Sequence, residues 1–167
     1  MILGESLMRL SLSVLLAAGL LSFGIAPAFA GATETAFLGK FAGQWTGGGQ
    51  VTGEHAGALD CSLAIRPVKT ALSFRGSCNM EGMSVQSFSG VLAYDDAGNR
   101  YVATSPNNDD VAIGSKKGNS LVFVTKLKNM AGSGNSTMTL SASRIAIDFA
   151  LASQSGKSSK SHLLFTK

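Results

Sequence analysis

Apolar and polar residues alternate along most of the chain after Gln44. The segment from Arg144 to Leu151 is the clearest case, because Ile145, Ile147, Phe149 and Leu151 are separated by Arg, Ala, Asp and Ala. A period of two residues is typical of a β-strand that buries one face and exposes the other. Clusters of Gly, Asn, Asp and Ser, such as the run at 95–99, interrupt the pattern and mark turns. The sequence therefore predicts an all-β fold.

Short connections decide how these strands are arranged. A parallel return needs a crossover of a dozen or more residues, so strands joined by such turns are expected to be antiparallel neighbours. Without helices to cover it, the apolar face can be buried only if the sheet closes on itself. We therefore predict one up-and-down barrel of about 8–10 strands over residues 31–167, preceded by a short helix near Thr33–Phe41. The strands are expected at Gln44–Thr52, Leu59–Ile65, Thr70–Cys78, Val85–Tyr94, Arg100–Thr104, Val111–Gly114, Ser120–Lys128, Thr137–Ala142, Arg144–Leu151 and His162–Thr166.

The inward face of such a barrel would be apolar. Its predicted members are Leu63, Ile65, Leu72, Phe74, Phe88, Leu92, Phe123, Met138, Leu140, Ile147 and Phe149. A small barrel is either filled by its own side chains or holds one small ligand. The many alanines and glycines in the strands favour unfilled volume and hence a small apolar ligand, with Arg75 and Gln86 as candidate polar contacts unless they face solvent. A structural barrel without a ligand remains the alternative.

The first thirty residues have the layout of a cleavable signal peptide. Arg9 precedes an apolar run from Leu10 to about Phe23, and Pro27 is followed by Ala28-Phe29-Ala30, an A-x-A cleavage site. The apolar run is shorter than the ~20 residues that span a bilayer. No cysteine near the cleavage point offers a lipid attachment site. We expect a periplasmic or secreted product that begins at Gly31 and lacks a transmembrane anchor.

The two cysteines are expected to form a disulfide. If the strands on either side of Val68–Ala71 pair as a hairpin, Ile65 lies opposite Phe74 and Cys61 lies opposite Cys78. That register places the sulfur atoms within bonding distance. An oxidising compartment favours the bridge, and a metal pair or redox couple would need a closer motif or further ligands.

Other residue types give little support to catalysis. The chain has two histidines, His55 and His162, and no G-x-S-x-G motif. The sequence therefore predicts no enzyme, no metal and no cofactor, and we assign His55 no role. The formal net charge is +4, but the cations are scattered, which argues against nucleic acid as a partner. An envelope protein remains a possible partner class.

The segment around the single tryptophan resembles the opening signature of lipocalins and other calycin barrels. Gly43 and Trp45 form the Gly-x-Trp motif at the first predicted strand. In those families the glycine allows close approach of the chain and the tryptophan closes one end of the barrel. The resemblance therefore implies structural roles for Gly43 and Trp45.

A longer version of the motif is similar to the start of nitrobindin-like barrels, which bind haem through a histidine near the C-terminus. Gly43, Trp45, Gly47 and Gly49 fit that pattern. The histidine in the last predicted strand is His162. If Leu163 and Phe165 point inward, His162 points outward and cannot ligate a buried haem.

The layout also resembles small periplasmic protease inhibitors that have a calycin-like barrel, a Gly-x-Trp opening and an early disulfide. That resemblance implies inhibition by the N-terminal segment, here Gly31–Phe41, inserted into a protease cleft. The features are shared by exported barrels in general. We therefore rank ligand binding first and inhibition second.

Overall fold

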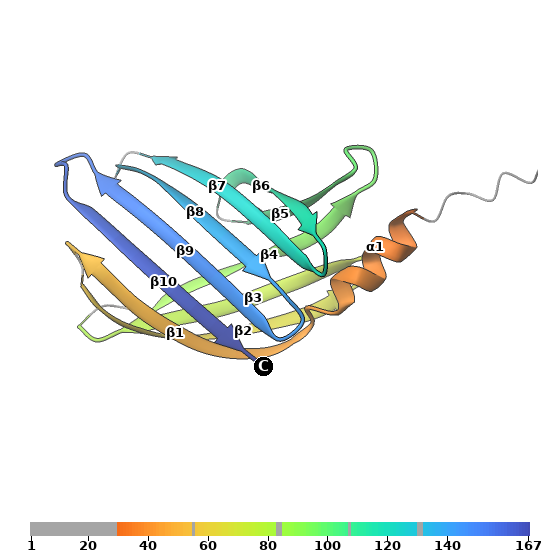
Figure 1. Cartoon of the computed structure of the whole chain (residues 1–167), viewed down its shortest axis with the longest axis horizontal. Coiled ribbons are helices and arrows are strands. Elements are labelled where there is room, and N and C mark those ends of the chain that lie inside the picture. The colour runs from red at the N-terminus through yellow and green to blue at the C-terminus, as the bar shows by residue number, and fades with distance from the viewer. Residues whose placement is uncertain (1–29, 55, 83–84, 107, 130–131) are drawn as a thin grey trace, which may run out of the picture.

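The computed structural model describes residues 30–54, 56–82, 85–106, 108–129 and 132–167. One helix is followed by ten strands: α1 (Ala30–Gly39), β1 (Gly43–Gly53), β2 (Gly57–Val68), β3 (Ala71–Met80), β4 (Gln86–Asp95), β5 (Arg100–Ser105), β6 (Asn108–Lys117), β7 (Ser120–Asn129), β8 (Gly132–Leu140), β9 (Arg144–Ser153) and β10 (Ser158–Thr166). Each strand pairs antiparallel with the next one, and β10 returns to pair with β1 (Figure 1). The predicted all-β barrel with a short N-terminal helix is confirmed.

The helix and the strand ends differ somewhat from the prediction. The helix begins at Ala30, three residues before Thr33, and ends at Gly39 instead of Phe41. Strand β8 begins five residues before the predicted Thr137, and β10 begins four residues before His162. These extensions are rich in Ser and Gly and have no apolar alternation, but their neighbours hold them in the ladder.

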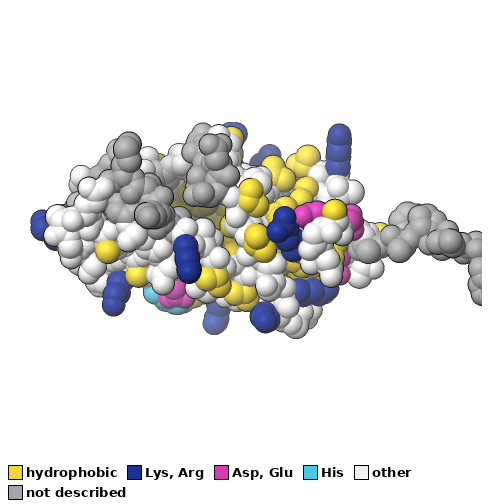
Figure 2. Space-filling view, turned by 90° about the horizontal axis from the view of Figure 1, so that it is seen from above, with side chains coloured by type: hydrophobic (Ala, Val, Ile, Leu, Met, Phe, Trp, Pro, Cys, Tyr) yellow, Lys and Arg dark blue, Asp and Glu magenta, His cyan; other side chains and the backbone are white. Residues whose placement is uncertain are grey.

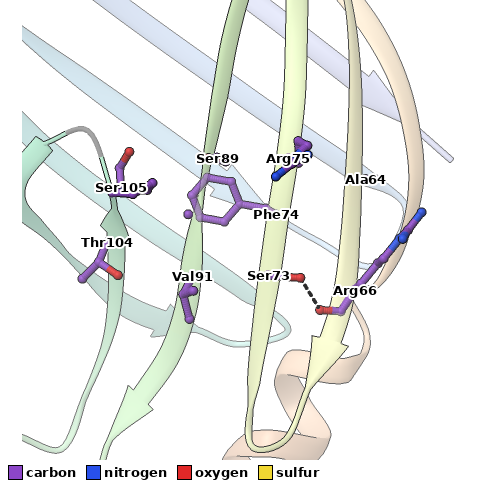
Figure 3. A pocket seen from close by; sticks show the side chains of 11 residues that line it. Ala64, Arg66, Ser73, Phe74, Arg75, Ser89, Val91, Thr104 and Ser105 are labelled. Carbon is purple, nitrogen blue, oxygen red and sulfur yellow. Dashed lines mark hydrogen bonds between the residues drawn. The ribbon is translucent and has the colours of Figure 1, made fainter.

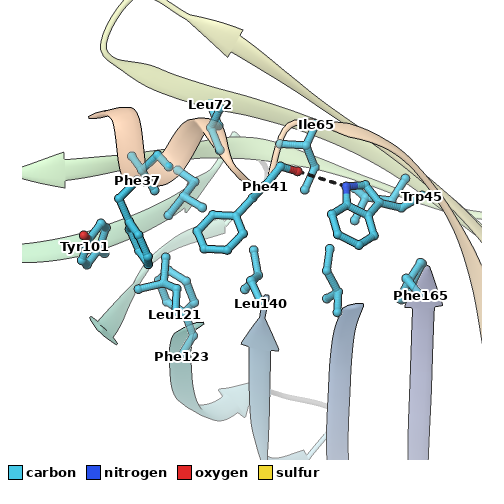
Figure 4. Packing of buried hydrophobic residues seen from close by; sticks show 14 of the residues in the cluster. Phe37, Phe41, Trp45, Ile65, Leu72, Tyr101, Leu121, Phe123, Leu140 and Phe165 are labelled. Atoms are coloured by element: carbon cyan, nitrogen blue, oxygen red, sulfur yellow. Dashed lines mark hydrogen bonds between the residues drawn. The ribbon is translucent and has the colours of Figure 1, made fainter. Parts of the chain in front are cut away.

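Helix α1 closes one end of the barrel (Figures 1 and 4). Phe37, Leu38 and Phe41 are 4 %, 1 % and 0 % exposed, and they pack with Trp45 and Phe165 across the barrel end. The indole Nε1 of Trp45 donates a hydrogen bond to the carbonyl oxygen of Phe41 at 3.1 Å. This end of the barrel is a filled apolar core, so unfilled volume must lie farther along the axis.

Glycines in β1 let that strand lie very close to β10. A Cβ at Gly47 would stand 2.0 Å from the carbonyl oxygen of Leu164, and one at Gly49 would stand 1.9 Å from that of His162. Side chains cannot be accommodated at such distances. The close pairing of the first and last strands, which closes the barrel, therefore depends on this glycine pattern.

Candidate ligand-binding cavity

A cavity of about 240 Å³ lies inside the barrel, next to the core that α1 closes. Its wall is formed by inward-facing residues of β2 to β9. The apolar lining residues are Leu63, Ile65, Phe74, Phe88, Leu92, Ala103, Ala112, Phe123, Met138, Leu140, Ile145 and Ile147. No charged side chain lines this cavity among the described residues. The predicted interior residues all belong to the same apolar cluster, and only Leu72 and Phe149 of that set do not line the cavity.

Three phenylalanine rings of this wall lie against glycines on the neighbouring strand. In each pair, a Cβ on the glycine would stand 2.4 to 2.6 Å from the ring. The pairs are Phe88 with Gly76, Phe74 with Gly90, and Phe123 with Gly114. Because each ring lies over a missing side chain, it is held close to the barrel wall. This arrangement leaves space along the axis that the rings would otherwise fill.

Two of the described residues that line the cavity have polar side chains, and each carries a hydroxyl group. Thr125 on β7 and Ser136 on β8 are direct cross-strand partners, and both are partly buried. Neither side chain forms a hydrogen bond with another described residue. An apolar pocket with a few placed polar groups is typical of small-molecule sites, where the polar groups set the ligand's orientation. The two hydroxyls are therefore available to one polar atom of a bound molecule.

Four lining residues were not predicted from the sequence: Thr125, Ser136, Ala103 and Ala112. The period-two pattern was a usable signal for Thr125, because it shares a strand face with Phe123. It was weaker for Ser136, which precedes the predicted start of its strand. The small side chains of Ala103 and Ala112 become informative only when their register places them in the wall.

Polar contacts fasten α1 to the barrel end. The hydroxyl of Tyr101 donates a hydrogen bond to Glu34, and the Nζ of Lys116 lies 3.3 Å from the Oε2 of Glu34. Partial burial, together with the carboxylates of Glu34, Asp96 and Asp95, raises the pKa of Tyr94 beside this cluster. Lys116 also lies over the ring of Phe37, with its Nζ 4.3 Å from the centroid. The helix is therefore tied to the barrel by charged as well as apolar contacts.

The N-terminal segment expected to act in protease inhibition lies in this closed end. It is mostly helical, and its large apolar side chains are buried. A peptide segment docks into a cleft either as an extended strand or as a helix with an exposed apolar face. The segment Gly31–Phe41 has neither property in this structure.

His162 points away from the barrel interior. Its side chain is 57 % exposed, whereas Leu163 and Phe165, on the inward face of the same strand, are 6 % and 0 % exposed. Its Nδ1 lies 2.6 Å from the Oδ1 of Asp148 on β9. The imidazole therefore cannot reach a group held inside the barrel. His55 and the predicted signal sequence up to Phe29 lie outside the described residues.

Arg75 and Gln86, the candidate polar contacts, do not line the cavity, and both are exposed. Arg75 lies instead in a concavity of about 750 Å³ on the outer face of β2 to β5 (Figure 3). Arg66 is its diagonal neighbour there, since Ala64 pairs with Arg75 and Arg66 pairs with Ser73. The two arginines of this outer face have no ion-pair partner among the described residues.

The cysteines have the predicted register. Cys61 on β2 lies directly opposite Cys78 on β3, and Ile65 lies opposite Phe74. The two sulfur atoms are at disulfide distance, and the Cα atoms are 4.1 Å apart. Cys61 is 7 % exposed, and both cysteines contact the apolar core. The pair links neighbouring strands from the inside of the barrel.

Within the described part of the chain, no group of three or more His, Cys, Asp or Glu side chains could hold a metal ion. No helix in that part is long and apolar enough to cross a membrane.

Comparisons with known proteins connect this chain to one fold. No protein-family model matches the sequence, and no curated protein matches it. Among solved structures, the S-type phycobiliprotein lyase CPES from Guillardia theta is similar, with a TM-score of 0.60 and 11 % sequence identity. The match covers 81 % of this chain and 92 % of the lyase. At this identity the similarity shows a shared calycin-like barrel fold.

Proposed function

We propose that this chain is an exported, non-enzymatic binding protein that holds a small apolar ligand inside its barrel. The observation that carries the proposal is the apolar cavity of about 240 Å³ with two hydroxyls that have no hydrogen-bond partner among the described residues. A filled structural barrel would leave no such space, because protein interiors normally contain few voids larger than a water molecule.

The volume limits the size of the ligand. An apolar cavity of roughly 150 Å³ can bind benzene, and pockets for drug-sized ligands start at roughly 300 Å³. A cavity of about 240 Å³ lies between these values. The ligand class is therefore a molecule with one or two rings or a short branched chain, uncharged, with no more than one or two hydrogen-bonding atoms.

The name of the structural neighbour raises an enzymatic alternative, which the cavity wall does not favour. The described lining residues offer two hydroxyls and no carboxylate, histidine, lysine or cysteine. General acid or base catalysis needs a group that can exchange a proton near neutral pH. A reaction inside this cavity would therefore depend on groups that the ligand itself brings.

Export is the second part of the proposal. It rests on the signal-like layout of residues 1–30 and on the Cys61–Cys78 pair, since disulfides persist in oxidising compartments. Fractionation of the native cells followed by mass spectrometry tests it. A periplasmic or secreted product starting at Gly31 supports export, and a cytosolic product that keeps its first thirty residues contradicts it.

Ligand binding is tested with 2-naphthol, a two-ring probe with one hydroxyl, followed by its fluorescence. We expect saturable binding at one site. Ala103→Phe adds a ring inside the cavity and should abolish binding, whereas Thr104→Phe adds the same ring on the exposed outer face of β5 and should not. If wild-type protein does not bind 2-naphthol, or if both variants lose binding equally, the proposal is wrong.

A further inference from the structure

The barrel wall is incomplete between β6 and β7. Their ladder runs only from the pair Lys117–Ser120 to the pair Gly114–Phe123. Beyond that point, Ile113, Ala112 and Asn108 of β6 pair with β5, and residues 124–129 of β7 pair with β8. Within the described residues, these two stretches have no ladder pairing with each other. Two strand edges therefore face a gap in the barrel wall, and the β4–β5 ladder likewise stops at the pair Val91–Thr104.

The gap adjoins the cavity on the inside. Ala112 and Thr125 are the first inward-facing residues beyond the last ladder pair, one on each edge, and both line the cavity. Both are also partly accessible to solvent. A methyl group and a threonine side chain leave little to block the space between the edges. The cavity therefore extends to the place where the ladder is missing.

On the outside, the part of the gap nearest the ladder is aliphatic, and the exposed Lys126 follows Val124 on the same face of β7. Val111 and Ile113 on β6 are 51 % and 48 % exposed, and Val124 on β7 is 63 % exposed. Natural proteins usually protect unpaired strand edges with charged residues or proline. β6 and β7 lie at the top of the barrel in Figure 1, and Figure 2 looks down on that side. It shows hydrophobic side chains gathered on this face. An apolar molecule would find contacts on this rim before reaching the cavity.

Access from the α1 end is obstructed. Phe41 and Trp45 fill the barrel there and are 0 % and 1 % exposed. A ligand using that route would have to displace the helix, together with its contacts through Glu34. A ligand that enters through the gap does not have to displace the helix.

We propose that the ligand of this barrel enters sideways between β6 and β7, across the rim formed by Ile113 and Val124 and past Ala112 and Thr125. This route rests on the proposed binding function. It agrees with the uncharged ligand class proposed above, because a molecule that passes between Ile113 and Val124 contacts aliphatic side chains before it reaches a cavity whose described lining has no charged residue. Entry through the end of the barrel opposite α1 is the competing route.

The test is to bridge the gap chemically. In Ile113→Cys/Val124→Cys, both new thiols lie on the outer rim and can be joined by a short bismaleimide, while Cys61 and Cys78 are occupied by their disulfide. The matched control is Ser115→Cys/Val122→Cys, which places the same bridge on the same two strands at a pair where the ladder is intact. Each double-cysteine variant is also measured before it is cross-linked, which shows whether the two substitutions alone disturb the fold.

Stopped-flow fluorescence with 2-naphthol gives the association and dissociation rates. Because the bridge alters the path and not the cavity, it should slow both rates by about tenfold or more and leave Kd nearly unchanged. The control bridge should change neither rate. Unchanged rates in the bridged Ile113→Cys/Val124→Cys protein, or equal slowing by both bridges, would show that the ligand uses another route. Failure of unbridged wild-type protein to bind would instead refute the binding function.

Discussion

Phe74 on β3 lies directly opposite Gly90 on β4, and its ring occupies the space that a side chain at position 90 would need. A Cβ built on Gly90 would stand 2.4 Å from the Cζ of Phe74 and 2.1 Å from the carbonyl oxygen of Thr104. The ring can rotate away, but the Thr104 carbonyl belongs to the backbone of β5. The pair therefore determines both the position of β5 and the space left in the cavity.

We predict that Gly90→Ala lowers the free energy of unfolding by roughly 1–3 kcal/mol, because overpacking forces backbone shifts. It should also weaken 2-naphthol binding, since the displaced Phe74 ring moves toward the cavity. Denaturant titration measures the first effect and fluorescence titration the second. Gly39→Ala is the control, because nothing lies within 4 Å of its Cβ position and its stability should stay the same or rise. Equal stability losses in the two variants would contradict the role of Gly90.

The hydroxyl pair should determine the preference for ligands with a polar atom. We expect Thr125→Val to keep the shape of the site and to reduce the preference for 2-naphthol over naphthalene by about threefold to tenfold, the usual worth of one hydrogen bond. Binding of naphthalene itself should change little. Thr137→Val on the outer face of β8 is the matched control and should leave both affinities unchanged. An unaltered preference in Thr125→Val would mean that this hydroxyl does not contact the ligand.

The sequence predicts the strands where apolar residues alternate and loses them where they do not. Ile145, Ile147 and Phe149 define β9 clearly, whereas the Ser-rich start of β10 carries no such signal. That start is a strand because Ser159 pairs with Leu151 and Lys160 pairs with Ala150. Tertiary pairing therefore sets these boundaries, and local pattern does not.

The interior residues were predictable, but the cavity among them was not. A list of inward-facing side chains does not say how much of the barrel they fill. That volume depends on which ring faces which glycine, as with Phe123 and Gly114, and hence on the register of strands far apart in the sequence. The gap between β6 and β7 depends on register in the same way.

Removal of the cross-strand sulfur pair should destabilise the barrel. The two cysteines are 17 residues apart, and a bridge closing a loop of that size contributes about 3 kcal/mol under the chain-entropy model. Cys61→Ala/Cys78→Ala should lose about that amount in urea titrations. A reducing agent should lower the stability of wild-type protein similarly and leave the double variant unchanged. If the reducing agent has no effect on wild-type protein, the bridge is either absent or without influence on stability.

Ser161 is a buried polar side chain on β10 whose replacement should be stabilising. It is 7 % exposed, and its Oγ has no hydrogen-bond partner among the described residues. Leaving a hydroxyl buried without a partner costs about 1–3 kcal/mol. We therefore expect Ser161→Ala to raise the free energy of unfolding by about 1 kcal/mol, while Ser143→Ala at an exposed turn stays within about 0.5 kcal/mol of wild type. A loss of stability in Ser161→Ala would instead reveal a bound water or ligand at this hydroxyl.

Asp95 should make the turn between β4 and β5 sensitive to acid. The backbone N–H of Gly98 donates to its Oδ1 at 3.1 Å, and the Nε of Arg100 lies 3.2 Å from its Oδ2. The hydrogen bond from Gly98, followed by that from Arg100, lowers the pKa of Asp95 below its ordinary value of 3.8. A carboxyl group whose pKa is lower in the folded state stabilises the fold above its unfolded pKa, and this contribution is lost as the pH falls through the folded value.

The stability difference between wild type and Asp95→Asn should therefore be constant above about pH 5 and shrink below about pH 4. Asparagine can still accept the hydrogen bond from Gly98, so the comparison isolates the charge. Urea titrations from pH 7 to pH 2.5 measure the difference. Asp96→Asn is the control, and its difference from wild type should not follow this course, because Arg100 and the Gly98 N–H contact Asp95. A difference between wild type and Asp95→Asn that stays constant down to pH 2.5 would show that the carboxylate of Asp95 does not contribute through its charge.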